Sequence, residues 1–244
     1  MFEDEIIDYL AKYNGFSKDY KNLFPSKEET ISLLMKVTLP NELEDSFYHM
    51  ENKYLKSLNK RFEYLDAKKV KYVNNMAVYK GNVSKIKGDI LVNPLATPIY
   101  NPQNLMIKEL NDELINYGGL EIRRDLLNEN AKRGKSFQDG DYLLTDAYNL
   151  AYKKILSFKL PTDGHSMEEI NSLSQNIISL WNSLKKERPH YVVIACEELE
   201  SSVVTLLIKT FVILLKTISY DMHVLFVDKK DERVKEYNEL IKQK

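Results

Sequence analysis

Asn93 is the polar residue of this sequence whose position most clearly suggests ligand binding. It follows the short apolar run Ile90-Leu91-Val92 and precedes Pro94. A β-branched run stopped by Asn-Pro predicts a buried strand that ends at Asn93. Ligands of open α/β sheets bind at the carboxyl ends of the strands. We therefore expect Asn93 to lie at a ligand-binding edge of a sheet.

A second group of reactive side chains follows another apolar run, at residues 195–202. Ser201 and Ser202 can cap the helix expected after them and offer hydroxyls to a ligand. Cys196 stands at a strand end before that helix, where a thiolate can be activated. Glutamates at 197, 198 and 200 would raise the pKa of this thiol. We expect Cys196 to be a buried, inert thiol.

Composition excludes several classes of protein. The formal net charge is −1, so the chain has no basic excess that would indicate a nucleic-acid partner. A single cysteine rules out an internal disulfide and a cysteine-rich metal site, and the four histidines have no spacing that suggests ligation. The longest apolar run, 203–215, is too short for a membrane span. We expect a cytoplasmic protein with no membrane or nucleic-acid partner, and the oligomeric state stays open.

Two kinds of element must position these residues. Residues 1–68 have helical periodicity throughout. Helices are expected around Ile6–Tyr13, after a capping box at Ser26, and from Pro40 to about Asp66. After residue 70, strands alternate with helices, which predicts a mostly parallel sheet between helical layers. The expected strands are 76–80, 89–93, 141–145, 153–158, 190–195 and 222–227. The expected helices are 104–117, 120–132, 167–186, 201–219 and 229–242.

Two sequence blocks resemble the macrodomain family. Gly81, Asp89, Val92 and Asn93 match its opening pattern, a Gly-Asp turn followed by a strand that ends in Asn-Ala-Ala-Asn. The stretch 140–150, Gly-Asp-Tyr-Leu-Leu-Thr-Asp-Ala-Tyr-Asn-Leu, is similar to its second block. The resemblance implies a three-layer α/β/α sandwich with a mixed, mostly parallel sheet at 70–244, preceded by a helical extension at 1–69.

The extension itself resembles that of a macrodomain subgroup. Residues 33–40, Leu-Leu-Met-Lys-Val-Thr-Leu-Pro, are similar to the N-terminal helices of zinc-containing macrodomains that remove ADP-ribose from proteins. The loop expected at 94–104 has three prolines and no glycine, cysteine or histidine. Zinc needs three or four nitrogen, sulfur or carboxylate ligands. We therefore expect no zinc, and no other cofactor, in a chain whose zinc and glycine-loop motifs are degenerate.

The resemblance also implies a binding site for ADP-ribose. Asn82 and Val83 would face the adenine and Asn93 the distal ribose. Ser201 and Ser202 would lie at the phosphates, and Tyr148 or Asn149 at the pocket wall. Asn82 stands where the family has an acid, so its hydrogen bond to adenine would be weaker, although Gly-Asn is also simply a good turn. The three glutamates before Ser201 would repel a diphosphate.

Two functions stay open. The first is a degenerate macrodomain that binds ADP-ribose or a related nucleotide weakly, or that acts as an interaction module for an ADP-ribosylated protein. The alternative is a metal-independent protein-ADP-ribose hydrolase. In that case Asn93 would position the ribose, and Asn111 or Asp112, on the helix that carries the family's working acid, would handle the water. Asp112 can equally serve only to complement the helix dipole.

Overall fold

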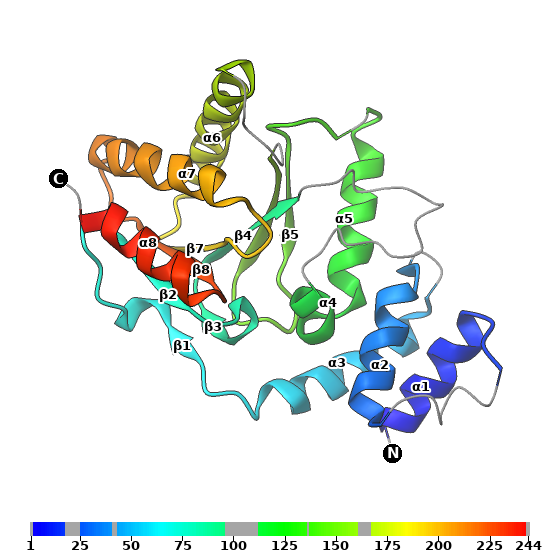
Figure 1. The fold of residues 1–244 in the computed structure, drawn as a ribbon. Coiled ribbons are helices and arrows are strands. Elements are labelled where there is room, and N and C mark those ends of the chain that lie inside the picture. The colour runs from blue at the N-terminus through cyan, green and yellow to red at the C-terminus, as the bar shows by residue number, and fades with distance from the viewer. Residues whose placement is uncertain are drawn as a thin grey trace.

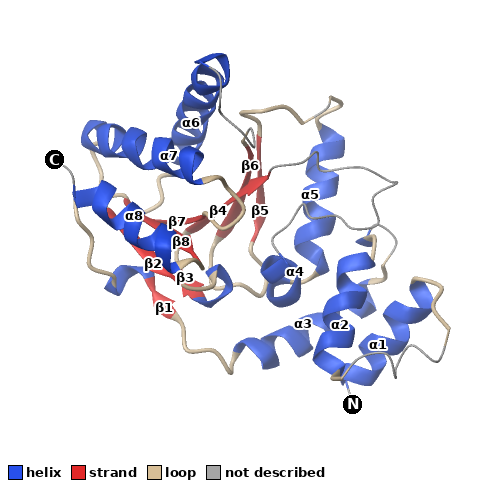
Figure 2. Ribbon diagram, in the orientation of Figure 1, coloured by secondary structure: helices blue, strands red, loops and turns tan. Residues whose placement is uncertain are grey.

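The computed structural model describes residues 2–17, 25–40, 43–95, 112–135, 137–160 and 167–242. Its centre is a six-stranded sheet with the order β2-β8-β7-β4-β6-β5 (Figure 2). The pairs are parallel except β5–β6, which is antiparallel. The strands are β2 (Met76–Lys80), β4 (Ile90–Leu95), β5 (Tyr142–Asp146), β6 (Lys154–Lys159), β7 (Tyr191–Ala195) and β8 (His223–Asp228). All six lie within two residues of the predicted ranges.

Helices cover both faces of this sheet, which confirms the three-layer α/β/α architecture (Figure 1). One face packs against α4 (Asp112–Gly118) and α5 (Leu120–Lys132). The other packs against α6 (Met167–Glu187), α7 (Ser201–Leu214) and α8 (Asp231–Lys242). In the described residues, no helix is both long and apolar enough to cross a membrane.

Three N-terminal helices lie beyond α4 in Figure 1, as the sequence predicts. They are α1 (Phe2–Tyr13), α2 (Lys27–Val37) and α3 (Asp45–Asn59). Ser26 caps α2 as expected, because its Oγ accepts a hydrogen bond from the Glu29 backbone at 3.2 Å. Packing of α2 and α3 against α4 joins the extension to the sheet-bearing part of the chain.

The prediction that the third N-terminal helix continues to about Asp66 is wrong. Helix α3 stops at Asn59, and Leu65–Asp66 form a short strand, β1, that pairs with β3 (Ile86–Lys87). The Asn59 amide donates to the carbonyls of Tyr117 and Asn149, at 2.9 and 2.8 Å. These long-range contacts hold the chain where the helix ends, so tertiary structure overrides the helical period.

Two further boundaries differ from the predictions. The α-helix expected at 201–219 ends at Leu214, and a 3-10 turn covers 215–217. Pro94 and Leu95, expected in a loop, are the last residues of β4. The pairing of β4 with β7 ends at Val92, so the strand can take up a proline without losing a hydrogen bond on that side. Of the helix expected at 104–117, residues 104–111 lie outside the described part.

Candidate functional site

Asn93 lies at the carboxyl end of the central strand and is almost fully buried. Its side chain is 2 % exposed, and no described group pairs with its Nδ2. Ser157 of β6 is in register with it, 1 % exposed, and its Oγ is likewise unpaired. In-register residues of parallel strands point to the same face about 4.8 Å apart. The sheet therefore presents a buried amide and a buried hydroxyl side by side toward the layer of α4 and α5.

Asn82 and Val83 follow the carboxyl end of β2, in the next part of the same edge. Gly81 donates to the Asp228 carbonyl at 3.1 Å, which ties this turn to the end of β8. The Asn82 side chain is half-buried and forms no cap on the short helix after it. Val83 is buried, and its carbonyl accepts from the Tyr152 hydroxyl at 2.7 Å.

An ion-pair network crosses this edge. Lys229, just after β8, places Nζ 2.6 Å from Glu113 of α4 and 2.6 Å from Glu197 after β7. Ser84 also donates to Glu113 from its hydroxyl at 3.0 Å. Burial alone would lower the pKa of Lys229, but its hydrogen bonds to the two glutamates outweigh burial and raise that pKa. Lys229 is therefore a permanent positive charge between two carboxylates.

Arg233 of α8 holds the loop between β7 and α7. Its guanidinium donates to the carbonyls of Cys196 and Leu199 at 2.9 and 2.7 Å. It also lies 3.2 Å from the buried Asp228 carboxylate. Burial, with a smaller effect of Asp228, raises the pKa of the Cys196 thiol to about 12. The buried thiol stays protonated, as the sequence suggests, although the acid responsible is Asp228 and not the neighbouring glutamates.

Ser201 and Ser202 begin α7 at this same edge. Their hydroxyls face other side chains: Ser201 accepts from Tyr237 at 3.4 Å, and Ser202 donates to Glu200 at 3.4 Å. The helix has no side-chain cap on its first turn, since Glu200 occupies the N-cap position without forming such a bond. Backbone N–H groups of that turn remain suited to an anionic ligand.

Tyr148 and Asn149 lie away from the other predicted site residues. They connect β5 to β6 at the amino end of β6, so they occupy the opposite edge of the sheet from Asn93. The Tyr148 hydroxyl donates to Asp125 of α5. The Asn149 amide donates to the Gly118 carbonyl at 3.0 Å. The structure shows these side chains bonded to helices, and it does not bring them together with Asn93.

The predicted water-handling residues, Asn111 and Asp112, cannot be placed in full. Asn111 lies outside the described residues, as does the side chain of Asp112, which begins the helix. Across the described part of the chain, no three His, Cys, Asp or Glu side chains are grouped so that they could hold a metal ion.

Three residues at the edge escaped sequence reasoning. Ser157 interrupts the apolar run Ile155–Phe158 of β6, and nothing in the sequence pairs it with Asn93. Glu113 stands next to Asp112 on the helix expected to carry the acid, and the sequence does not predict its contacts with Lys229 and Ser84. Lys229 lies two residues after the strand predicted at 222–227, and a lysine so close to the carboxyl end of a strand is a signal that could have found it.

Sequence comparison with protein-family models finds no match, and a search of curated proteins finds no relative. Comparison of structures does find matches. A Trypanosoma brucei macrodomain in complex with ADP-ribose matches 86 % of this chain and 94 % of its own length, with a TM-score of 0.61 and 13 % identity. This chain has a macrodomain fold.

Other macrodomains match similarly. A mutant macrodomain from Oceanobacillus iheyensis covers 70 % of this chain with a TM-score of 0.58 and 12 % identity, over 94 % of its own length. The T. brucei protein in complex with ADP covers 88 % of this chain and 96 % of its own, at 14 % identity and a TM-score of 0.61. Residues 70–244 are less than three quarters of the chain, so the T. brucei match extends into the N-terminal helices.

Proposed function

We propose that this protein binds ADP-ribose or a closely related nucleotide at the carboxyl edge of its sheet, weakly and without a metal. The observation that carries the proposal is the Asn93 Nδ2, a buried donor beside the Ser157 hydroxyl, neither of which has a partner among the described groups. A buried polar group without a partner costs about 1–3 kcal/mol. A ribose hydroxyl would pair with both groups and remove that cost.

The adenine end of the ligand would lie against Asn82 and Val83. An amide oxygen accepts a hydrogen bond from the adenine amino group, but such a bond is weaker than one to a carboxylate. Val83 adds a buried apolar surface beside it. The substitution of Asn for an acid therefore supports weak binding.

The diphosphate would lie near Ser201 and Ser202. Lys229 compensates the charge of Glu197, so this loop repels anions less than its sequence predicts. Glu200 still stands at the N-cap of α7, where a negative charge opposes a phosphate. Both facts favour binding in the weak range, and the T. brucei macrodomain bound to ADP-ribose or ADP supports the ligand class.

We favour binding over hydrolysis. Glu113, the residue after Asp112, is engaged by Lys229 and Ser84, so its carboxylate makes structural contacts and is not free to activate a water. The expected biological role is recognition of an ADP-ribosylated protein. Incubation with such a protein should leave its ADP-ribose in place. Release that an Asp112→Ala variant abolishes would show the hydrolase instead.

Thermal unfolding in the presence of small ligands tests the proposal. A ligand that binds only the folded protein raises Tm, and each kcal/mol adds about 2–4 °C in a chain of this size. We expect millimolar ADP-ribose to raise Tm by a few degrees and ribose 5-phosphate, which lacks the adenine, to raise it less. An unchanged Tm with ADP-ribose would contradict the proposal.

A further inference from the structure

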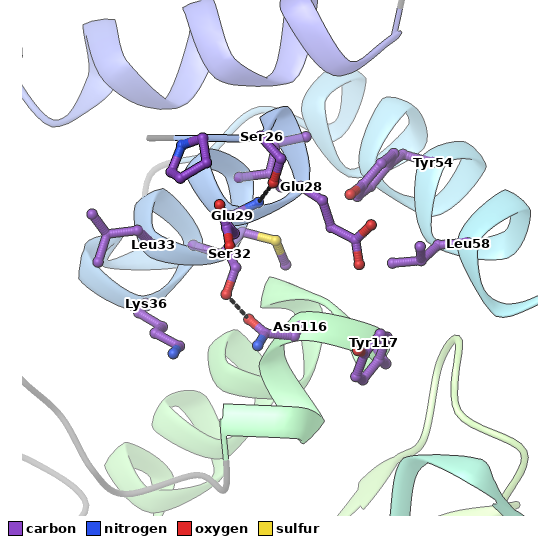
Figure 3. Close-up of a pocket in the computed structure, with 13 residues that line it drawn as sticks. Ser26, Glu28, Glu29, Ser32, Leu33, Lys36, Tyr54, Leu58, Asn116 and Tyr117 are labelled. Carbon is purple, nitrogen blue, oxygen red and sulfur yellow. Dashed lines mark hydrogen bonds between the residues drawn. The ribbon is translucent and has the colours of Figure 1, made fainter. Parts of the chain in front are cut away.

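A cavity of about 700 Å³ lies between α2, α3 and α4 (Figure 3). It is lined by Glu28 and Ser32 of α2, Tyr54 and Leu58 of α3, and Tyr117 of α4, among others. No lining residue among those described belongs to the sheet or to the loops at its carboxyl ends. The cavity is therefore separate from the site around Asn93.

The exposed carboxylate of Glu28 lines this cavity. Figure 3 shows the Glu28 side chain directed between Tyr54, Leu58 and Tyr117. Among the described residues, none forms a hydrogen bond or ion pair with Glu28. Lys36, the basic residue of the lining, lies on the other side of the Ser32–Asn116 hydrogen bond from Glu28 (Figure 3). Of the described basic residues, none is ion-paired with Glu28, so its charge remains available to a cationic ligand.

The tyrosines beside Glu28 complete the arrangement. Tyr54 is only 8 % exposed, its hydroxyl points into the cavity in Figure 3, and no described group bonds to that hydroxyl. Burial, with a smaller contribution from Glu28, raises the pKa of Tyr54 and of Tyr117. Both rings therefore stay neutral and keep the electron-rich faces that attract cations.

We propose that this cavity binds the arginine side chain of a partner polypeptide. Glu28 would accept a two-point hydrogen bond from the planar guanidinium, the Tyr54 hydroxyl would accept a further one, and the ring of Tyr117 would stack on it. Leu58 lines the cavity and would pack on the methylene stem. A lysine ammonium, a compact and strongly hydrated charge, uses neither the fork geometry nor the ring faces as well.

An NMR titration tests the proposal with defined probes. The full-length ¹⁵N-labelled protein is titrated with N-acetyl-arginine methylamide, and in parallel with the citrulline analogue, which has the same shape but no charge. We expect the arginine probe to shift the amide signals of Glu28, Tyr54 and Tyr117, and the citrulline probe to bind at least fivefold more weakly. Equal binding of the two probes, or shifts only elsewhere, would overturn the proposal.

Matched variants test whether Glu28 supplies the charge that binds the arginine probe. Glu28→Gln should weaken the arginine probe about fivefold, whereas Glu187→Gln, which removes an exposed charge on the far helix α6, should leave it unchanged. Tyr54→Phe, which keeps the ring and deletes the hydroxyl, should weaken the probe about twofold. Equal affinity of wild type and Glu28→Gln would contradict the assignment. The dispersion of the spectrum shows whether each variant is folded.

The source of the guanidinium is tested separately. A Gly-Arg-Gly peptide, blocked at both ends, should bind at least as tightly as the single residue. Binding of free arginine in preference to the peptide would refute a polypeptide partner. Because ADP-ribose is absent from these titrations, their outcome does not depend on the nucleotide site.

Discussion

Asn93 and Ser157 hold polar atoms in the core of this protein without any partner among the described groups. Most buried polar atoms in native proteins are hydrogen-bonded, so each exception calls for an explanation. Here the two exceptions are in register on adjacent strands, at the sheet edge where α/β proteins bind ligands. A binding site for a polar ligand keeps polar groups unpaired until the ligand binds, and this lowers the stability of the ligand-free protein.

Ser157→Ala tests this account of the cost. Removal of an unpaired hydroxyl should leave the free energy of unfolding unchanged or raise it by up to about 1 kcal/mol, while ADP-ribose binding weakens. The control is Asn59→Ala, whose amide donates to two carbonyls and whose loss should lower that free energy by about 1–3 kcal/mol. Denaturant unfolding measures both. A clear loss of stability in Ser157→Ala would show that the hydroxyl is structural.

Only part of this site is predictable from the sequence. The sequence predicts Asn82, Asn93 and Ser201 at the ends of strands that share one edge, because apolar runs and the polar residues that end them are local signals. The sequence does not predict the ion pairs of Lys229 with Glu113 and Glu197, since they depend on the packing of α4 over the ends of β7 and β8. Tyr148 was assigned from a motif, and a motif does not state which edge of the sheet its loop occupies.

Helices α3 and α5 are joined by a buried carboxylate. Glu51 of α3 is fully buried, and both of its oxygens lie 3.2 Å from the Leu120 backbone nitrogen at the start of α5. The adjacent Gly119 has φ +101°, and a side chain there would collide with this carboxyl. Glu51 therefore caps α5 from another helix. Burial raises its pKa to about 8, against the opposing effect of the Leu120 hydrogen bond.

Glu51→Gln tests the capping contact through pH. The pKa is raised in the folded state, so the folded protein holds a proton that the unfolded chain releases above about pH 4.5. The contribution of Glu51 to the free energy of unfolding is fully present below that pH. It falls by up to about 4 kcal/mol as the pH rises toward 8. The free energy of unfolding of Glu51→Gln should not decline in this way, so the variant should become more stable relative to wild type as the pH rises.

The control for this experiment is Glu236→Gln, at an exposed position of α8, which should follow the wild-type pH profile. Urea unfolding from pH 5 to pH 8 gives the comparison. Parallel profiles for wild type and Glu51→Gln would mean that the carboxyl is charged when folded.

Strands were the elements most accurately predicted from the sequence. Polar residues flank several of the six, such as Asn74-Asn75 before β2 and Gly140-Asp141 before β5, and all six lie close to their predicted bounds. The helix expected through Asp66 failed because Leu65 pairs with Ile86, a contact between residues that no local pattern connects. Local signals thus fix the elements, whereas their ends are decided by long-range packing.

The molecule as a whole shares one core between its extension and its sheet. The core on the α4 side of the sheet contains Leu10 and Leu55 from the N-terminal helices together with Leu91 and Leu225 from the sheet. Arg123 of α5 also donates to the Lys36 and Thr38 carbonyls at the end of α2, at 2.9 and 2.8 Å. The N-terminal helices and the sheet are therefore packed into one core.

A chain shortened to residues 70–244 tests this coupling. It would expose Leu114, Leu120 and the Glu51-binding end of α5 to water. We expect it to unfold at a Tm at least 10 °C lower than the full chain, or to aggregate, because each buried leucine contributes about 1.5–3 kcal/mol. Circular dichroism melting measures the difference. An equal Tm would show that residues 1–69 are an independent appendage.

Calorimetric titration of ADP-ribose into the wild-type protein and into Asn93→Ala tests the proposed function most directly. Because the buried Asn93 amide has no partner among the described groups, we expect wild type to bind ADP-ribose with measurable heat and a Kd in the micromolar to millimolar range. We expect at least a tenfold weaker Kd for Asn93→Ala, equivalent to about 1.4 kcal/mol, with an unchanged Tm. Asn149→Ala, at the opposite edge, should bind as wild type does. No heat with wild type, or equal heat with Asn93→Ala, would contradict a nucleotide site at this edge.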